Sequence, residues 1–130
     1  MWFEKIITYC QEFYENLDIS YNVVSIVSGE MNDVASIKYD LEAFFPNTNC
    51  FRKLVSCSNC TGFQSRSLEV RYGVGKEDDK KVYVYILNCT MCAIEHTLYC
   101  ILEKHQKEDK TINSRPLRKY FDGEFIIFKE

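Results

Sequence analysis

The chain has 130 residues, of which 46% are apolar and 15% aromatic, and its net charge is −3. This composition is typical of one globular domain over residues 1–130 and excludes a disordered chain. No apolar run reaches the roughly 20 residues that a membrane-spanning helix needs. Because charges interrupt the apolar N-terminus, we expect no secretory signal there and a cytoplasmic protein.

The first 45 residues give a mixed pattern. Aromatic and β-branched side chains over residues 3–17 favour an extended strand. Their spacing favours an amphipathic helix instead, because apolar side chains recur at helical intervals at Phe3, Ile6, Ile7, Cys10, Phe13, Tyr14 and Leu17. Residues 21–28, bounded by Gly29, predict a strand. Residues 31–45 are again mixed, and Pro46 ends them.

The rest of the chain is predicted to be mainly strands. Such patterns cover residues 51–57, 67–74, 80–89, 96–102 and 124–129. The polar stretch GKEDDKK would form the charged tip of a β-hairpin between the second and third of these segments. We therefore expect a mainly β fold, a single compact domain with room for one short helix.

Two C-x-x-C pairs are the most specific motif in the chain. Seven cysteines are an odd number, and a cytoplasmic protein keeps its thiols reduced, so a disulfide framework is not expected. Two C-x-x-C turns at strand ends would bring four sulfurs together in a tetrahedron, the closed shell of one structural zinc ion. The predicted ligands are Cys57, Cys60, Cys89 and Cys92. Iron also suits four sulfurs and stays an alternative.

The sequence shows no sign of an active site. It has no Ser–His–Asp spacing, no phosphate-binding loop and no H-E-x-x-H motif, so we expect a protein without catalytic residues or enzymatic activity. A redox dithiol is disfavoured because it uses one C-x-x-C pair in a βαβ setting. Cys10, Cys50 and Cys100 are expected in the core, and His96 and His105 in packing or surface positions.

Charge is unevenly spread along the chain. Residues 1–50 hold two basic and eight acidic side chains, whereas residues 104–119 hold six basic and two acidic ones. This asymmetry predicts a basic surface on an acidic protein, although solvated loops would give the same pattern. The candidate RNA- or ribosome-binding residues are Arg66, Arg71, Lys80, Lys81, Lys104, Lys107, Lys110, Arg115, Arg118 and Lys119.

The stretches FRKLVSCSNC and LNCTMC resemble the eukaryotic family of CXXC-motif-containing zinc-binding proteins. The segment YENLDIS at Tyr14–Ser20 matches a Glu-Asn step of that family, and the similarity runs to Leu102. The resemblance implies a mainly β protein whose four cysteines hold one zinc ion, with a strand rather than a helix at the N-terminus. The Tyr-, Lys- and Asn-rich composition is similar to the microsporidian form, a dormancy factor of hibernating ribosomes.

This resemblance implies a non-enzymatic, ribosome-associated protein. It would occupy the tRNA exit site, contact rRNA and ribosomal proteins, and inhibit translation by excluding deacylated tRNA. The alternative is a zinc-ribbon-like adaptor or small subunit of another complex, such as the transcription machinery. A redox or metal-transfer enzyme is the third possibility, which a closed sulfur shell disfavours.

Overall fold

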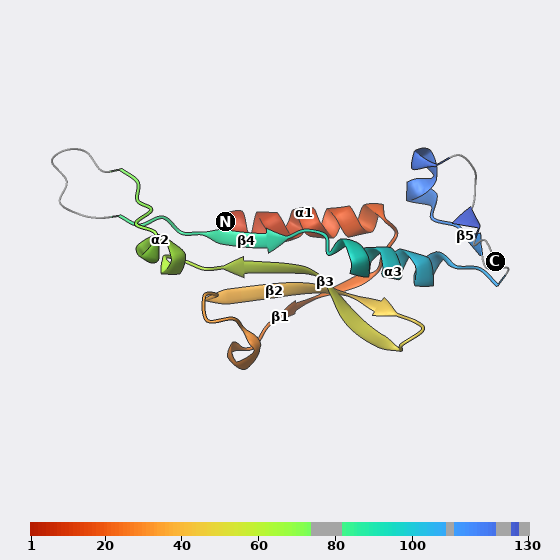
Figure 1. The fold of residues 1–130 in the computed structure, drawn as a ribbon, viewed down its shortest axis with the longest axis horizontal. Coiled ribbons are helices and arrows are strands. Elements are labelled where there is room, and N and C mark those ends of the chain that lie inside the picture. Colours follow the sequence, from red (N-terminus) through yellow and green to blue (C-terminus); the bar gives the residue numbers. More distant parts are fainter. Residues whose placement is uncertain (74–81, 109–110, 122–125, 128–130) are drawn as a thin grey trace.

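A computed structural model describes residues 1–73, 82–108, 111–121 and 126–127. The molecule is elongated, with α2 at one end and the last elements of the chain at the other (Figure 1). In chain order the elements are α1 (Trp2–Asn16), β1 (Tyr21–Ser25), the 3-10 helix η1 (Ser28–Glu30), β2 (Ile37–Phe45), β3 (Cys50–Asn59), α2 (Phe63–Ser67), β4 (Leu87–Thr90), α3 (Ile94–His105), β5 (Thr111–Ile112), the 3-10 helix η2 (Arg115–Tyr120) and β6 (Ile126–Ile127).

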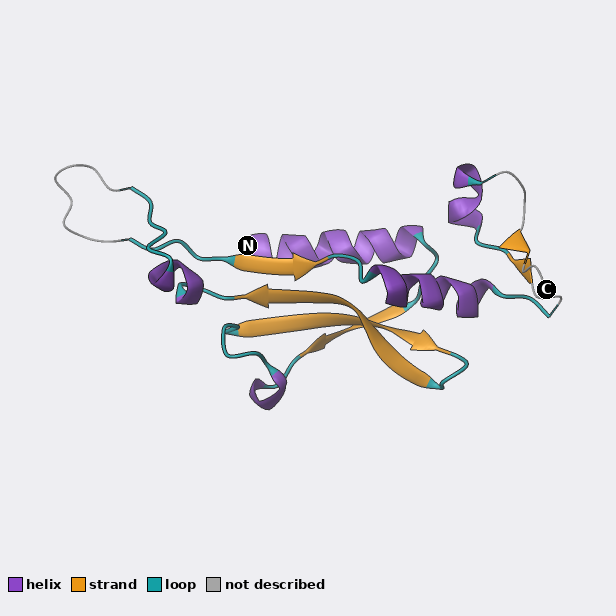
Figure 2. Ribbon diagram, viewed as in Figure 1, coloured by secondary structure: helices purple, strands orange, loops and turns teal. Residues whose placement is uncertain are grey.

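The main sheet has four antiparallel strands in the order β1-β2-β3-β4 (Figure 2). Strands β2 and β3 form a long hairpin, and its turn is closed by the N–H of Asn49, which donates to the carbonyl of Pro46 at 3.3 Å. Asn49 adopts a left-handed backbone (φ 50°), a conformation that asparagine tolerates better than most residues. A register shift between Leu41 and Glu42 marks a β-bulge. Strands β5 and β6 pair separately.

Helix α1 forms because its buried side chains recur every three or four residues. Phe3, Ile7, Cys10 and Tyr14 are all buried and face the sheet. Asp18, in the left-handed region (φ 56°), ends the helix, and the N–H of Ile19 turns back to the carbonyl of Tyr14.

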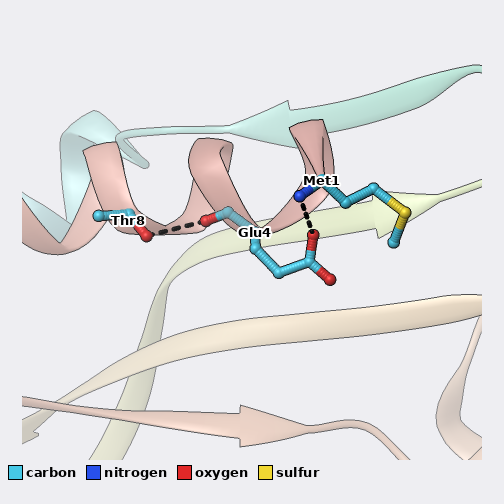
Figure 3. Close-up of polar contacts among 3 residues, drawn as sticks. All are labelled: Met1, Glu4 and Thr8. Atoms are coloured by element: carbon cyan, nitrogen blue, oxygen red, sulfur yellow. Dashed lines mark hydrogen bonds and ion pairs between the residues drawn. The ribbon is translucent and has the colours of Figure 1, made fainter.

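The first turns of α1 also carry exposed polar contacts (Figure 3). The hydroxyl of Thr8 donates to the carbonyl of Glu4 at 2.9 Å, and the Met1 amino group lies 3.5 Å from Glu4 Oε2. Because this ion pair is exposed to solvent, it adds little stability. Burial of the apolar stripe therefore holds α1 in place.

The hydrophobic core lies between one face of the sheet and the helices α1 and α3. Leu41, Val55 and Cys57 from the sheet join Cys100 and Ile101 from α3 in this core. The two helices also meet directly, since the hydroxyls of Tyr14 and Thr97 lie 2.9 Å apart in the interior. Burial raises the pKa of Tyr14, so its hydroxyl stays protonated and can donate.

Tyr14→Phe is expected to lower the free energy of unfolding by about 1–2 kcal/mol, because it removes this buried hydrogen bond and leaves the Thr97 hydroxyl without it. Urea unfolding measures the loss. Tyr9→Phe, at a position 55% exposed on the same helix, is the matched control and should change stability by less than about 0.5 kcal/mol. Equal effects of the two substitutions would contradict the role given to the Tyr14 hydroxyl.

Several sequence-based expectations for the fold are wrong. The fold is α/β rather than mainly β, since the described residues include two long helices packed on an antiparallel sheet. The N-terminal segment is the helix α1 and not a strand, and residues 96–102 belong to the helix α3. In both segments the apolar residues pack on the sheet at helical spacing, and this tertiary contact outweighs their β propensity.

Two strand predictions are confirmed, the first of them over part of its range. Residues 21–25 form β1, and residues 51–57 lie within β3. The predicted strands at residues 67–74 and 80–89 are only partly found: the second segment contains the start of β4 (Leu87–Thr90), residues 67–73 form no strand, and the two segments meet at the isolated bridge between Arg71 and Tyr83. The predicted tip at residues 75–81 lies outside the described part. No helix among the described residues is long and apolar enough to cross a membrane. That residues 1–130 form one domain stays a prediction.

Candidate functional site

The sheet has a polar face on the side opposite α1. Residues paired directly across antiparallel strands share a face, and successive residues alternate between faces. Tyr39 stacks on Phe3, and Cys89 contacts Cys10. Tyr39, Cys89 and their shared cross-strand partner Cys57 therefore lie on the side of the sheet that faces α1. Two cross-strand rows therefore lie on the other side: Asp40, Ser56 and Thr90, and beside them Lys38, Ser58 and Asn88.

The polar face presents several hydrogen-bonding groups within a small area. Asn88 and Thr90 on β4 are exposed, and Ser56 on β3 is half-buried. The face thus offers one amide and several hydroxyl groups, which can both donate and accept hydrogen bonds. Such a set suits a small polar ligand rather than an apolar one.

An ion pair lies on this polar face. The Lys53 ammonium is 3.3 Å from Asp40 Oδ2, and the Asp40 side chain is only 5% exposed. The bulge at Leu41/Glu42 allows this contact, because it places Lys53 opposite Glu42 on the polar side. The second oxygen, Oδ1, is buried and has no hydrogen-bond partner in the described structure. Lys53 therefore provides the charge that a buried carboxylate requires.

Helix α3 begins next to the backbone of Lys53. The ring nitrogen Nδ1 of His96 lies 3.1 Å from the carbonyl oxygen of Lys53, which can only accept, so Nδ1 carries the proton. A pocket of about 250 Å³ continues from here along α3 to the β2–β3 hairpin. Arg52 stacks over Phe45 in its wall, and Glu103 accepts the N–H of Asn47 at 3.0 Å. The contacts of His96 and Glu103 join α3 to the hairpin.

The two C-x-x-C pairs do not form the predicted knuckles. Cys57 and Cys89 are cross-strand partners in extended β3 and β4, and both face α1. Because the strands are antiparallel, Cys60 follows the end of β3 and Cys92 follows the end of β4 at opposite ends of the strand pair. No group of three or more Cys, His, Asp or Glu residues among those described could hold a metal ion. The zinc-stabilised β domain is therefore wrong, whereas zinc binding itself stays an untested prediction.

These thiols are part of the interior. Burial raises the pKa of Cys57, raises that of Cys89 to about 11 and raises that of Cys10 to about 12. Cys60 is buried, and Cys92 donates to the hydroxyl of Thr97 at 3.4 Å. Cys10, Cys57 and Cys89, as neutral thiols, behave as small apolar side chains. Cys10 and Cys100 are buried as expected, but Cys50 is half-exposed beside Thr48.

The predicted basic surface is not gathered in one place. Arg66 lies in α2 at one end of the molecule and Arg115 in η2 at the other (Figure 1). The Lys104 ammonium donates to Ser20, and the Arg71 guanidinium pairs with Glu69. Arg118 donates to Asn113, Lys119 lies over the ring of Tyr120, and Lys107 is exposed, while Lys80, Lys81 and Lys110 fall outside the described residues.

Sequence reasoning missed the polar face. Its signal was the alternation in SCSN of β3 and NCT of β4, where polar residues flank each cysteine. The same residues fit a metal-binding motif, in which only the cysteines would have a role. The strand register distinguishes the two interpretations, because it places Ser56 and Thr90 on one face of the sheet and Cys57 and Cys89 on the other.

Comparison with known proteins identifies the family. The model of the tRNA synthetase class II core domain (G, H, P, S and T) matches residues 2–105. The chain belongs to this family. Its synthetase core is 58% identical over 123 residues to the serine–tRNA ligase of Encephalitozoon cuniculi, a match that covers 95% of this chain and 29% of that protein. The cytoplasmic serine–tRNA ligase of Saccharomyces cerevisiae is 52% identical over 94% of the chain and 27% of that protein.

Solved structures agree with this family. The seryl-tRNA synthetase of Pyrococcus horikoshii complexed with ATP matches with a TM-score of 0.91 at 41% identity, over 99% of this chain and 29% of that one. The cytoplasmic serine–tRNA ligase of Naegleria fowleri in complex with AMP matches with a TM-score of 0.90 at 42% identity, over 98% of this chain and 31% of that one. The synthetase core described here thus spans less than a third of the length of these relatives.

The family corrects the functional expectations. The resemblance to CXXC-motif zinc-binding proteins is wrong, because the chain matches a synthetase core in which Cys57 and Cys89 are cross-strand partners. The expectation of a non-enzymatic protein is wrong, since tRNA synthetases are enzymes. The ribosome-bound dormancy factor, the exit-site partner and the transcription adaptor are overturned by the same matches.

Proposed function

We propose that the chain forms part of the core of a serine–tRNA ligase, and that its polar sheet face is one wall of the substrate site. The observation that carries this proposal is the match over 99% of the chain, with a TM-score of 0.91, to a seryl-tRNA synthetase complexed with ATP. The substrates would be serine, ATP and tRNA. ATP activates the serine carboxylate, and a tRNA hydroxyl then accepts the acyl group.

The chemistry of the polar face supports this assignment. Serine brings an ammonium, a carboxylate and a hydroxyl, and each needs a hydrogen-bonding partner when it leaves water. Ser56, Asn88 and Thr90 supply such partners from adjacent strands of one rigid sheet. A site built on strands holds a small ligand more accurately than one built on loops.

A cytoplasmic location is part of the same proposal. The relatives from Saccharomyces cerevisiae and Arabidopsis thaliana are named cytoplasmic serine–tRNA ligases. We propose that the protein containing this core acts in that compartment.

The polar face needs further walls to enclose its substrates. Since the chain matches 29% of the E. cuniculi protein, the test places it in a hybrid, which is that ligase with its matching segment replaced by this chain. We expect the hybrid to attach serine to tRNA, and the 130 residues alone to give no seryl-tRNA, because one open sheet face cannot exclude water from the reaction. Acid-precipitable radioactive serine measures both.

The E. cuniculi enzyme without replacement is the positive control. A hybrid that folds with the stability of that enzyme, yet forms no seryl-tRNA and binds no serine, would contradict the proposed function. Circular dichroism and thermal unfolding establish the folded state separately from activity.

A further inference from the structure

Three cysteines meet where α1 packs on the sheet. Cys10 of α1 and Cys89 of β4 have their sulfur atoms 3.6 Å apart, and Cys57 of β3 is the cross-strand partner of Cys89. All three are free thiols. Cys10 and Cys57 are fully buried, whereas Cys89 is half-buried. The proposed serine–tRNA ligase chemistry uses none of them, because they lie on the face opposite the polar residues.

We propose that Cys10 and Cys89 are a reversible disulfide site that low-molecular-weight disulfides such as oxidised glutathione oxidise. At mildly alkaline pH a small fraction of Cys89 is ionised, and this thiolate attacks one sulfur of the reagent, forms a mixed disulfide and releases one thiol. The Cys10 thiolate then attacks the Cys89 sulfur and releases the second thiol. Two protein thiols are oxidised, one reagent disulfide is reduced to two thiols, and the protons of Cys10 and Cys89 pass to those thiols.

Geometry selects this pair. A disulfide has a sulfur–sulfur distance near 2.0 Å, and the thiols of Cys10 and Cys89, already in contact at 3.6 Å, need to approach by about 1.6 Å. Cys89 is the entry point because it is the most exposed of the three. Cys60 and Cys92 lie beyond the ends of β3 and β4, and Cys50 lies at the start of β3 next to Thr48.

The bond would fix α1 to β4 beneath the polar face. Cys89 lies between Asn88 and Thr90, whose side chains point to the opposite side of the same strand. The two cysteines are 79 positions apart, so their bond closes a long loop in the unfolded chain and should raise the midpoint of thermal unfolding by several degrees. Reduction should reverse the shift.

The test treats the purified full chain with oxidised glutathione at mildly alkaline pH. We expect titratable thiols in denaturant to fall from seven to five, and peptide mapping without reduction to find Cys10 joined to Cys89. Cys10→Ala should instead retain glutathione on Cys89, because the resolving thiol is gone. Cys50→Ala is the matched control and should still form the Cys10–Cys89 bond.

Two results would overturn the inference. One is a linked peptide that pairs Cys89 with Cys57 rather than Cys10. The other is seven unmodified thiols after exposure that fully oxidises a small dithiol in the same tube. The readouts are covalent and need no enzymatic activity, so they stand apart from the fate of the proposed function.

Discussion

Asn88→Ala in the hybrid ligase is expected to lower kcat/KM for serine about 10- to 100-fold, the loss that follows when a hydrogen bond to a charged ligand group is removed. Asn88 is exposed on the polar face, in one row with Lys38 and Ser58. Its amide has little packing to lose, so the melting temperature should not change. Steady-state aminoacylation at varied serine concentration measures the effect.

The matched control is Asn16→Ala, an exposed asparagine at the end of α1. Its amide donates to the carbonyl of Glu12 at 2.8 Å and lies on an element that packs against the opposite face. The control should retain kcat/KM within about twofold. If both variants keep full activity, Asn88 does not contact serine and the polar face loses its main support as a serine site.

Leu41→Ala is expected to lower the free energy of unfolding of the chain by about 2–5 kcal/mol. Leu41 is completely buried, and its cross-strand partners on β1 and β3 are Val23 and Val55. The substitution leaves a cavity where the sheet meets the helices, because the close-packed surroundings relax only in part. Urea unfolding, followed by circular dichroism, measures the loss.

Val23→Ala is the control, because Val23 pairs with Leu41 but is 40% exposed on the edge strand. Its expected cost is below about 1 kcal/mol. Equal costs at the two positions would place the core elsewhere than between the sheet and the helices.

The strands could be predicted from the sequence more readily than the helices. Residues 21–25 and 50–59 are strands because β-branched and alternating residues fit a pleated sheet with one face buried. The helix α1 has the spacing of an amphipathic helix, and that spacing was the better guide. Helix α3 begins at Ile94, and its residues Tyr99, Cys100 and Ile101 carry strand propensity that only contact with the sheet outweighs.

The candidate site could be found in the sequence only once the strand register was known. A C-x-x-C motif gives a metal knuckle when the chain turns between the cysteines, but Cys57 lies within an extended strand that continues to Asn59. In that strand the serines at positions 56 and 58 point away from the cysteine between them. The spacing of the cysteines is the same in a metal knuckle and in a strand. Only the long-range pairing of β3 with β4 distinguishes the two structures.

The most direct test of the proposed substrate face is a crystal structure of the hybrid ligase bound to a non-hydrolysable analogue of seryl-adenylate. We expect the seryl group on the polar face, within hydrogen-bonding distance of Ser56 or Asn88 and on the side of the sheet away from Cys57 and Cys89. An analogue bound on the helix-covered side, or one that makes no contact with β3 and β4, would contradict the proposal.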